Sequence, residues 1–182
     1  GYGGSCFPKD VVALVQTGRE HGLELELAGV TDRVNQRQKG VLARKLRQHF
    51  DGFLRGKRIA VWGIAFKPRT DDIREAPAVA LIDALLAEGA TVAAHDPEAM
   101  KQARALFGDR ITLVDDAYDA ARDADALVLV TEWRQYQNPD FDRLKTTMRR
   151  PLLLDGRNIW TRYGLRKQGF VYDGIGVMTT PG

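Results

Sequence analysis

The side chain with the clearest chemical potential is Cys6, the single cysteine of the chain, which stands in a glycine-rich run just before a predicted helix. A helix N-terminus and the ammonium group of Lys9 would both favour the thiolate, the form of cysteine that attacks carbon. Asp10 follows directly and could orient a water molecule or act as a base. The alternative is that Cys6 is a small buried apolar side chain, the common state of a lone cysteine. The residues alone leave both interpretations open.

A second candidate is the charged loop that follows the apolar strand predicted at 57–62. It carries the cations Lys67, Arg69 and Arg74 beside two aspartates. Arginine binds phosphate oxygens in pairs and lysine adds a point charge, so the loop could hold a diphosphate. The alternative is a solvated loop in which Arg74 pairs with one of its neighbours, Asp71 or Asp72.

The same loop is a poor dinucleotide site. A dinucleotide fingerprint has three glycines after the first strand of the sheet, but here only Gly63 fits and Ala65 stands at the second glycine position. We therefore do not expect a dinucleotide to bind this loop.

Two further phrases follow apolar strands, where ligands of parallel sheets bind. They are Thr131-Glu132-Trp133 and Asp155-Gly156-Arg157, and Arg157 is a candidate partner for an anionic group. Either phrase could instead be plain loop structure. The three histidines lie in unrelated contexts, with no spacing that indicates zinc and none placed to serve Cys6 as the base of a cysteine hydrolase.

The elements that must position these residues fall into two parts. Residues 1–56 read as helical, with helices expected at 10–21 and 28–50. Residues 57–182 alternate strands and helices, which predicts an α/β domain with a parallel sheet covered on both faces. The strands are expected at 57–62, 91–95, 111–114, 126–130 and 152–154, and the last segments, 162–168 and 170–172, close the series.

Composition excludes several classes of protein. The 182 residues are 44% hydrophobic and carry a net charge of +3, so nucleic acid is not the expected partner and a small anionic ligand suits the charge equally well. The longest apolar run is far too short to span a membrane. A single cysteine fits a reducing, cytoplasmic compartment.

In this order, the phrases resemble the signatures of the UDP-glucose/GDP-mannose dehydrogenase family. The run Gly-Gly-Ser-Cys-Phe-Pro-Lys-Asp at 3–10 is similar to the catalytic cysteine motif of that family. The run Gly-Ile-Ala-Phe-Lys-Pro-Arg-Thr-Asp-Asp-Ile-Arg-Glu-Ala-Pro at 63–77 resembles its second signature. The phrases at 131–133 and 155–157 follow in family order, so the resemblance covers essentially the whole chain.

The resemblance implies two Rossmann-like domains joined by a long helix. Residues 1–56 would hold the catalytic cysteine loop and the central helices of a homodimer. Residues 57–182 would form the UDP-sugar-binding domain, a doubly wound parallel sheet. The chain opens in mid-motif, so we expect a piece of a longer protein whose NAD-binding domain precedes it. The piece alone would then be inactive.

The implied reaction oxidises the C6 alcohol of the sugar to a carboxylate with two NAD. Cys6 would capture the intermediate aldehyde, Asp10 would serve the hydrolytic water, and Lys9 would lie near the cofactor and the thiolate. Arg74 would reach NAD held by the missing domain, and no metal is implied. The positions matched to substrate contacts are Gly3, Phe66, Lys67 and Arg157.

Within the family, the run Cys-Phe-Pro-Lys-Asp favours the branch that oxidises UDP-glucose. GDP-mannose enzymes also keep the lysine, and relatives acting on N-acetylated sugars tend to carry another residue there. A further alternative is that the chain as given is only a nucleotide-binding and dimerisation module. Asn35 receives no catalytic role, because the catalytic asparagine of the family lies before the cysteine.

Overall fold

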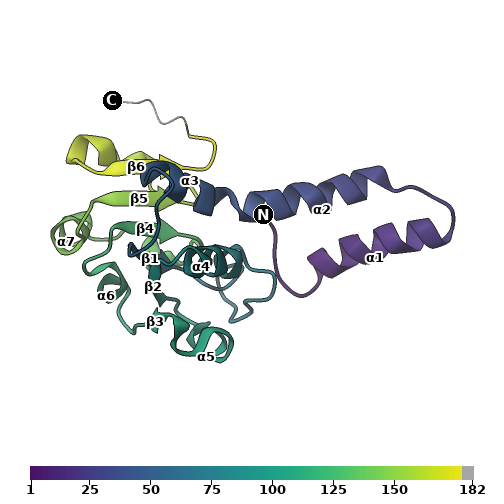
Figure 1. Cartoon of the computed structure of the whole chain (residues 1–182), viewed down its shortest axis with the longest axis horizontal. Coiled ribbons are helices and arrows are strands. Elements are labelled where there is room, and N and C mark those ends of the chain that lie inside the picture. Colours follow the sequence, from purple (N-terminus) through teal and green to yellow (C-terminus); the bar gives the residue numbers. More distant parts are fainter. Residues whose placement is uncertain (178–182) are drawn as a thin grey trace.

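The computed structural model describes residues 1–177 and shows an α/β body from which a two-helix arm projects (Figure 1). The body contains one parallel sheet with the strand order β3-β2-β1-β4-β5-β6. This order, with β1 and β4 adjacent at the centre, is the doubly wound order of Rossmann-like folds. The strands are β1 (Arg58–Trp62), β2 (Thr91–His95), β3 (Thr112–Leu113), β4 (Ala126–Leu129), β5 (Leu152–Asp155) and β6 (Val171–Gly174).

Helices cover both faces of this sheet. In Figure 1, α6 and α7 lie on one side, and α3, α4 and α5 lie on the other. The helices of the body are α3 (Val41–His49), α4 (Pro77–Ala87), α5 (Met100–Phe107), α6 (Ala117–Ala121) and α7 (Phe141–Thr147), with short 3₁₀ turns at Gly108–Arg110, Arg134–Tyr136, Thr161–Tyr163 and Leu165–Gln168. The predicted fold class, a parallel α/β sheet covered on both faces, is confirmed.

Burial explains why the central strands read as apolar runs. Every residue of β4 and β5 is buried, as are the last four residues of β1. A strand covered on both faces needs apolar side chains at consecutive positions rather than at alternate ones. The helix α4 opens with Pro77 in its first turn, where a missing amide proton costs nothing.

The arm consists of α1 (Phe7–Glu20) and α2 (Glu26–Lys39), which pack side by side. The first helix begins three residues earlier than expected, because Pro8 is accepted in a first helical turn and does not extend the loop. The expected single helix over 28–50 is wrong. It is two helices, and the chain bends between them at Gly40, where the side chain of Arg44 donates to the carbonyl of Arg37.

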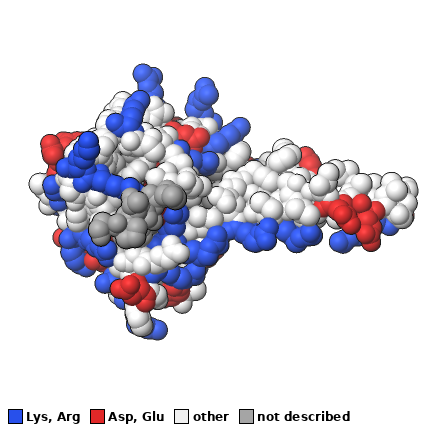
Figure 2. All heavy atoms as spheres, turned by 90° about the horizontal axis from the view of Figure 1, so that it is seen from above, with Lys and Arg blue, Asp and Glu red and all other residues white. Residues whose placement is uncertain are grey.

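The two parts of residues 1–56 have different environments. Leu42, Ala43 and Leu46 of α3 are buried in the same core as β1 and β4. The arm instead leaves large apolar side chains exposed, including Leu27 at 85% and Val34 at 45%. Figure 2 shows the arm with a broad uncharged face and with Lys and Arg side chains along one edge.

Among residues 1–177, no helix is long and apolar enough to cross a membrane. The last five residues of the predicted unit 57–182 lie outside the described part of the chain.

Candidate functional site

The loop that carries the cysteine docks on the loop between β1 and α4. The amide of Gly4 donates to the carbonyl oxygen of Arg74 at 2.8 Å. A Cβ atom on Gly3 would stand 2.5 Å from the carbonyl oxygen of Glu75. Gly4 has a φ of +90°, and its Cβ would stand 2.8 Å from the ring of Phe66. Glycine is therefore required at Gly3 by the nearby backbone of Glu75, and at Gly4 by its positive φ and the Phe66 ring.

Cys6 lies at the start of α1 and is exposed. Its Sγ is 3.6 Å from the hydroxyl of Ser5, and its carbonyl accepts the first-turn amide of Asp10 at 3.0 Å. Exposure excludes the alternative in which Cys6 is a buried apolar side chain. The thiol therefore stands at a helix N-terminus and is open to a reactant.

Lys9 and Asp10 extend from the same turn as Cys6. Their charged groups are 3.9 Å apart, with side chains 71% and 64% exposed. An exposed pair at this distance contributes little to stability, so both groups are free to turn toward a ligand. Their proximity to Cys6 in sequence is preserved in space, and their expected roles stay predictions.

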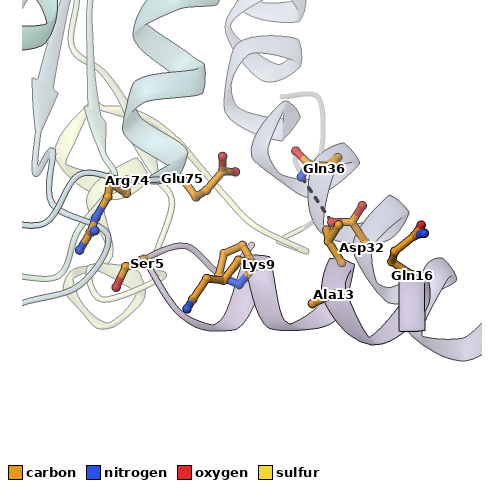
Figure 3. A pocket seen from close by; sticks show the side chains of 11 residues that line it. Ser5, Lys9, Ala13, Gln16, Asp32, Gln36, Arg74 and Glu75 are labelled. Atoms are coloured by element: carbon orange, nitrogen blue, oxygen red, sulfur yellow. Dashed lines mark hydrogen bonds between the residues drawn. The ribbon is translucent and has the colours of Figure 1, made fainter. Parts of the chain in front are cut away.

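A cleft of about 770 Å³ opens beside the cysteine. Figure 3 shows Ser5, Lys9, Arg74 and Glu75 on its walls, with side chains of α2 opposite. Among the latter, Gln36 donates to Asp32 at 3.4 Å. The cleft thus lies between the arm and the two docked loops.

Arg74 projects beside this cleft and holds Asp72 with two hydrogen bonds, at 2.9 and 2.8 Å. These bonds lower the pKa of the Asp72 carboxyl and raise the pKa of Arg74, to which the charge of Cys6 adds a smaller contribution of the same sign. Pairing with a neighbouring aspartate, the alternative stated for this arginine, is therefore observed. Arg74 also lies within electrostatic reach of the cysteine.

Phe66 and Lys67 sit where the two loops meet. Phe66 is half-buried against Gly4, and the ammonium group of Lys67 lies 5.3 Å from the centre of the Phe66 ring. Lys67 is exposed. The apolar ring is fixed by the cysteine loop, while the lysine charge remains available to solvent.

Arg157 connects the ends of two strands to the same loop. Its Nε donates to the carbonyl of Val130 at 2.7 Å, and its terminal nitrogen donates to the carbonyl of Phe66 at 3.4 Å. The carboxylate of Glu132 lies 3.0 Å from Nε. The structure therefore links Gly4, Phe66 and Arg157 through direct contacts, although they are far apart in sequence.

Two side chains of α2 support this arrangement and were not predicted to do so. Asn35 is buried and exchanges hydrogen bonds with the backbone of Tyr2, at 2.7 and 3.0 Å. The side chain of Lys39 is only 6% exposed and pairs with Glu75 at 2.5 Å. The available signal was their spacing of four on one helix face, in a helix rich in other polar residues.

Thr131 and Trp133 of the phrase at 131–133 support neighbouring loop structure. The hydroxyl of the fully buried Thr131 donates to the carbonyl of Ala65 at 2.5 Å. The indole of Trp133 donates to Asp96 at 3.0 Å. Both residues hold the loop after β1 in place.

The amides at the start of that loop are also engaged. Ile64 and Ala65 donate to one carboxylate oxygen of Asp96, at 2.6 and 2.9 Å. In a dinucleotide-binding sheet such amides face the phosphates. The occupied amides support the expectation that this loop does not bind a dinucleotide.

The described residues contain no group of three or more His, Cys, Asp or Glu side chains arranged to hold a metal ion.

Comparison with known proteins identifies the family to which the chain belongs. The model of the UDP-binding domain of the UDP-glucose/GDP-mannose dehydrogenase family matches residues 60–162. The chain belongs to this family. The model of the family's central domain also matches residues 1–37.

The chain is similar to UDP-glucose 6-dehydrogenases from two bacteria. It is 46% identical to the Pseudomonas aeruginosa protein over 181 residues and 48% identical to the Rhizobium meliloti protein over 176 residues. Each match covers 97% of this chain and 40% of the relative, so the chain spans well under half the length of these family members.

Solved structures of family members share the fold. A UDP-glucose dehydrogenase from Pyrobaculum islandicum superposes with a TM-score of 0.84 at 35% identity, over 98% of this chain and 38% of the archaeal one. An NDP-N-acetyl-D-galactosaminuronic acid dehydrogenase from Methanosarcina mazei gives 0.78 at 26% identity, over 97% and 38%. The predicted family and Rossmann-like fold are confirmed.

Proposed function

We propose that this chain is the part of a UDP-glucose 6-dehydrogenase that carries the nucleophile and binds the nucleotide of the sugar. The observation that carries the proposal is the docking of the cysteine loop on the loop of Phe66 and Lys67. A thiol and candidate phosphate-binding cations thereby share one surface. The similarity to UDP-glucose 6-dehydrogenases over nearly the whole chain supports the choice of substrate.

We assign nucleotide binding to the loop of Phe66 and Lys67, and catalysis to the cysteine loop. Lys67 and Arg157 would bind the diphosphate, because both are cations beside Phe66. Phe66 would pack against the nucleotide sugar. Gly3, the remaining proposed substrate contact, lies beside Phe66 at the junction of the two loops.

On the cysteine side, the Cys6 thiolate would add to the C6 aldehyde carbon and form a thiohemiacetal, which prevents escape of the aldehyde. Oxidation of this adduct gives a thioester. Water then attacks the thioester carbon and releases the carboxylic acid and the thiol. Asp10 would accept the proton of that water, and Lys9 would stabilise the thiolate.

NAD would supply the hydride acceptor for both oxidations. The amides of Ile64 and Ala65 in the loop after β1 are not free to bind it, because they already donate to Asp96. We therefore propose that NAD binds a part of the protein outside this chain and that Arg74, exposed beside the cysteine cleft, contacts it. Such a protein would act in the cytoplasm, where cysteines stay reduced.

Replacement of the cysteine in the full-length protein tests the proposal. Cys6→Ser should abolish formation of UDP-glucuronate, measured by product analysis alongside NADH. Thr17→Ser, an exposed substitution further along α1, should leave the rate unchanged. Acid formation at the wild-type rate by Cys6→Ser would contradict the role of Cys6. Calorimetry should show tighter binding of UDP than of GDP; the reverse would favour a GDP-sugar substrate.

We also propose that residues 1–56 provide the contact surface of a homodimer, whereas residues 57–182 bind the nucleotide sugar. The support is the apolar surface of the projecting arm, where Val30 and Val34 of α2 are 40% and 45% exposed. In sedimentation of the full-length protein, Val34→Asp should shift the dimer toward monomer. Leu106→Asp, at a residue of similar exposure (47%) on α5, should not. Identical sedimentation of both variants would contradict the dimer surface.

A further inference from the structure

The side chain of Asp96 lies at the carboxyl end of β2 and is surrounded by hydrogen-bond donors. The residue is only 1% exposed. One carboxylate oxygen accepts the amides of Ile64 and Ala65 at 2.6 and 2.9 Å and the indole of Trp133 at 3.0 Å. The other accepts two backbone amides of the segment that leads into α5, both at 2.9 Å. Five donors from three segments therefore converge on one carboxylate.

Such convergence is typical of an anion site. In sheets with this strand order, the loop after β1 turns its amides toward a phosphate of the ligand. Here the same amides face a carboxylate of the neighbouring strand. A buried carboxylate is tolerated where hydrogen bonds replace its lost hydration, and five donors meet that need. Asp96 thus supplies internally the anion that a ligand supplies elsewhere.

This anchoring continues into the proposed nucleotide site. The carbonyl of Ala65 accepts the hydroxyl of Thr131, so Ala65 is held at both amide and carbonyl, and Ile64 is held at its amide. Phe66 follows directly, with its carbonyl toward Arg157 and its ring against Gly4. The position of the anchored turn therefore sets the positions of Phe66 and its neighbour Lys67.

We propose that Asp96 is a positioning residue whose carboxylate fills an internal anion site on the β1 loop and so orients Phe66 and Lys67 for the nucleotide diphosphate. The positioning role rests on the proposed function. The anion site itself depends only on the five donors. The two parts are therefore tested separately.

The positioning role is tested by Asp96→Asn in the full-length protein, with Asp125→Asn as the matched control. The control residue is 6% exposed and accepts the amide of Arg58 at 2.8 Å at the opposite end of β1. Asparagine keeps the size of the side chain but turns an NH₂ group toward donors. Asp96→Asn should weaken UDP binding about tenfold in calorimetry and raise KM for UDP-glucose by a similar factor, with a smaller change in kcat.

Asp125→Asn should lower the melting temperature and leave both UDP binding and KM unchanged. Unchanged UDP binding in Asp96→Asn, or equal weakening in both variants, would overturn the positioning role. A wild-type protein that neither binds UDP nor oxidises UDP-glucose would remove the proposed function and this role together.

The anion site is tested by Asp96→Gly with formate as the probe. Formate should raise the melting temperature of this variant in a concentration-dependent manner, because an anion that binds the native state stabilises it. It should not do so for the wild-type protein or for Asp125→Gly. If formate does not raise the melting temperature of Asp96→Gly specifically, the anion site is overturned, whatever the outcome with UDP.

Discussion

The amide of Gly4 donates a 2.8 Å hydrogen bond to the carbonyl of Arg74, and this contact joins the cysteine loop to the loop between β1 and α4. Helices α1, α2 and α3 and strand β1 lie between these two residues in the sequence. Their contact places Cys6, the candidate nucleophile, beside the loop of the candidate nucleotide contacts. Disrupting this contact should therefore lower kcat more than it weakens binding of the nucleotide sugar.

Gly3→Ala should separate the two loops. The added Cβ would stand 2.5 Å from the carbonyl oxygen of Glu75, a backbone atom that cannot move aside alone. We expect a loss of about 1–3 kcal/mol in the free energy of unfolding and a large fall in kcat of the full-length protein. Gly29→Ala is the control, because its Cβ would meet only the flexible end of Arg33 at 3.5 Å. Wild-type kcat in Gly3→Ala would contradict the proposed coupling of the loops.

Removal of the partner of Lys39 should destabilise the junction between arm and body. Glu75→Ala would leave a lysine that is 6% exposed without its carboxylate, at a cost of about 2 kcal/mol in denaturant unfolding. The cost is moderated because Glu75 is itself 53% exposed. Asp83→Ala, which breaks the exposed pair with Arg110, should cost less than about 0.5 kcal/mol. Equal losses in the two variants would show that the burial of Lys39 has no energetic consequence.

The strands could be predicted from sequence because their signal is local. The strand expected at 91–95 coincides with β2, whose consecutive apolar residues at 92–94 are buried, as a strand covered on both faces requires. The bend at Gly40 could not be predicted, because apolar spacing continues from Val34 through Leu42 and Leu46 on both sides of it. Apolar periodicity indicates which face of a helix is buried, but it does not show whether the segment is one continuous helix or two consecutive helices.

The contacts that support the candidate site could not be predicted from the sequence. A glycine run beside Cys6 fits close approach of a ligand or of backbone, and only the long-range contact of Gly3 with Glu75 distinguishes the two. The sequence likewise does not show whether Asp96, which follows β2, faces a ligand or another part of the chain. Whether Asp96 faces a ligand or the β1 loop depends on the paths of three segments, which no local pattern records.

Stability should depend on pH through His95. Burial lowers the pKa of this imidazole below its ordinary value of 6.5, against smaller opposing contributions from Asp96 and Asp116. Between the lowered pKa and 6.5 the unfolded chain binds more protons than the folded one, so the free energy of unfolding rises with pH there. The contribution is complete above 6.5 and is lost as pH falls through the folded pKa. His95→Gln should flatten this slope in denaturant unfolding; a slope as steep as in the wild type would contradict the assignment.

Glu132 should compete with the nucleotide for Arg157. Its carboxylate lies 3.0 Å from Nε of the arginine, whose side chain is 28% exposed, so a diphosphate must share or displace this interaction. Glu132→Gln removes the competing charge and keeps the shape of the side chain. We expect UDP to bind about threefold to tenfold more tightly in calorimetry, and more so at low ionic strength. Glu88→Gln, which disrupts the pair with Arg47 at α3, should not change UDP binding. Weaker UDP binding in Glu132→Gln would mean that the carboxylate orients Arg157 for the phosphate rather than competing with it.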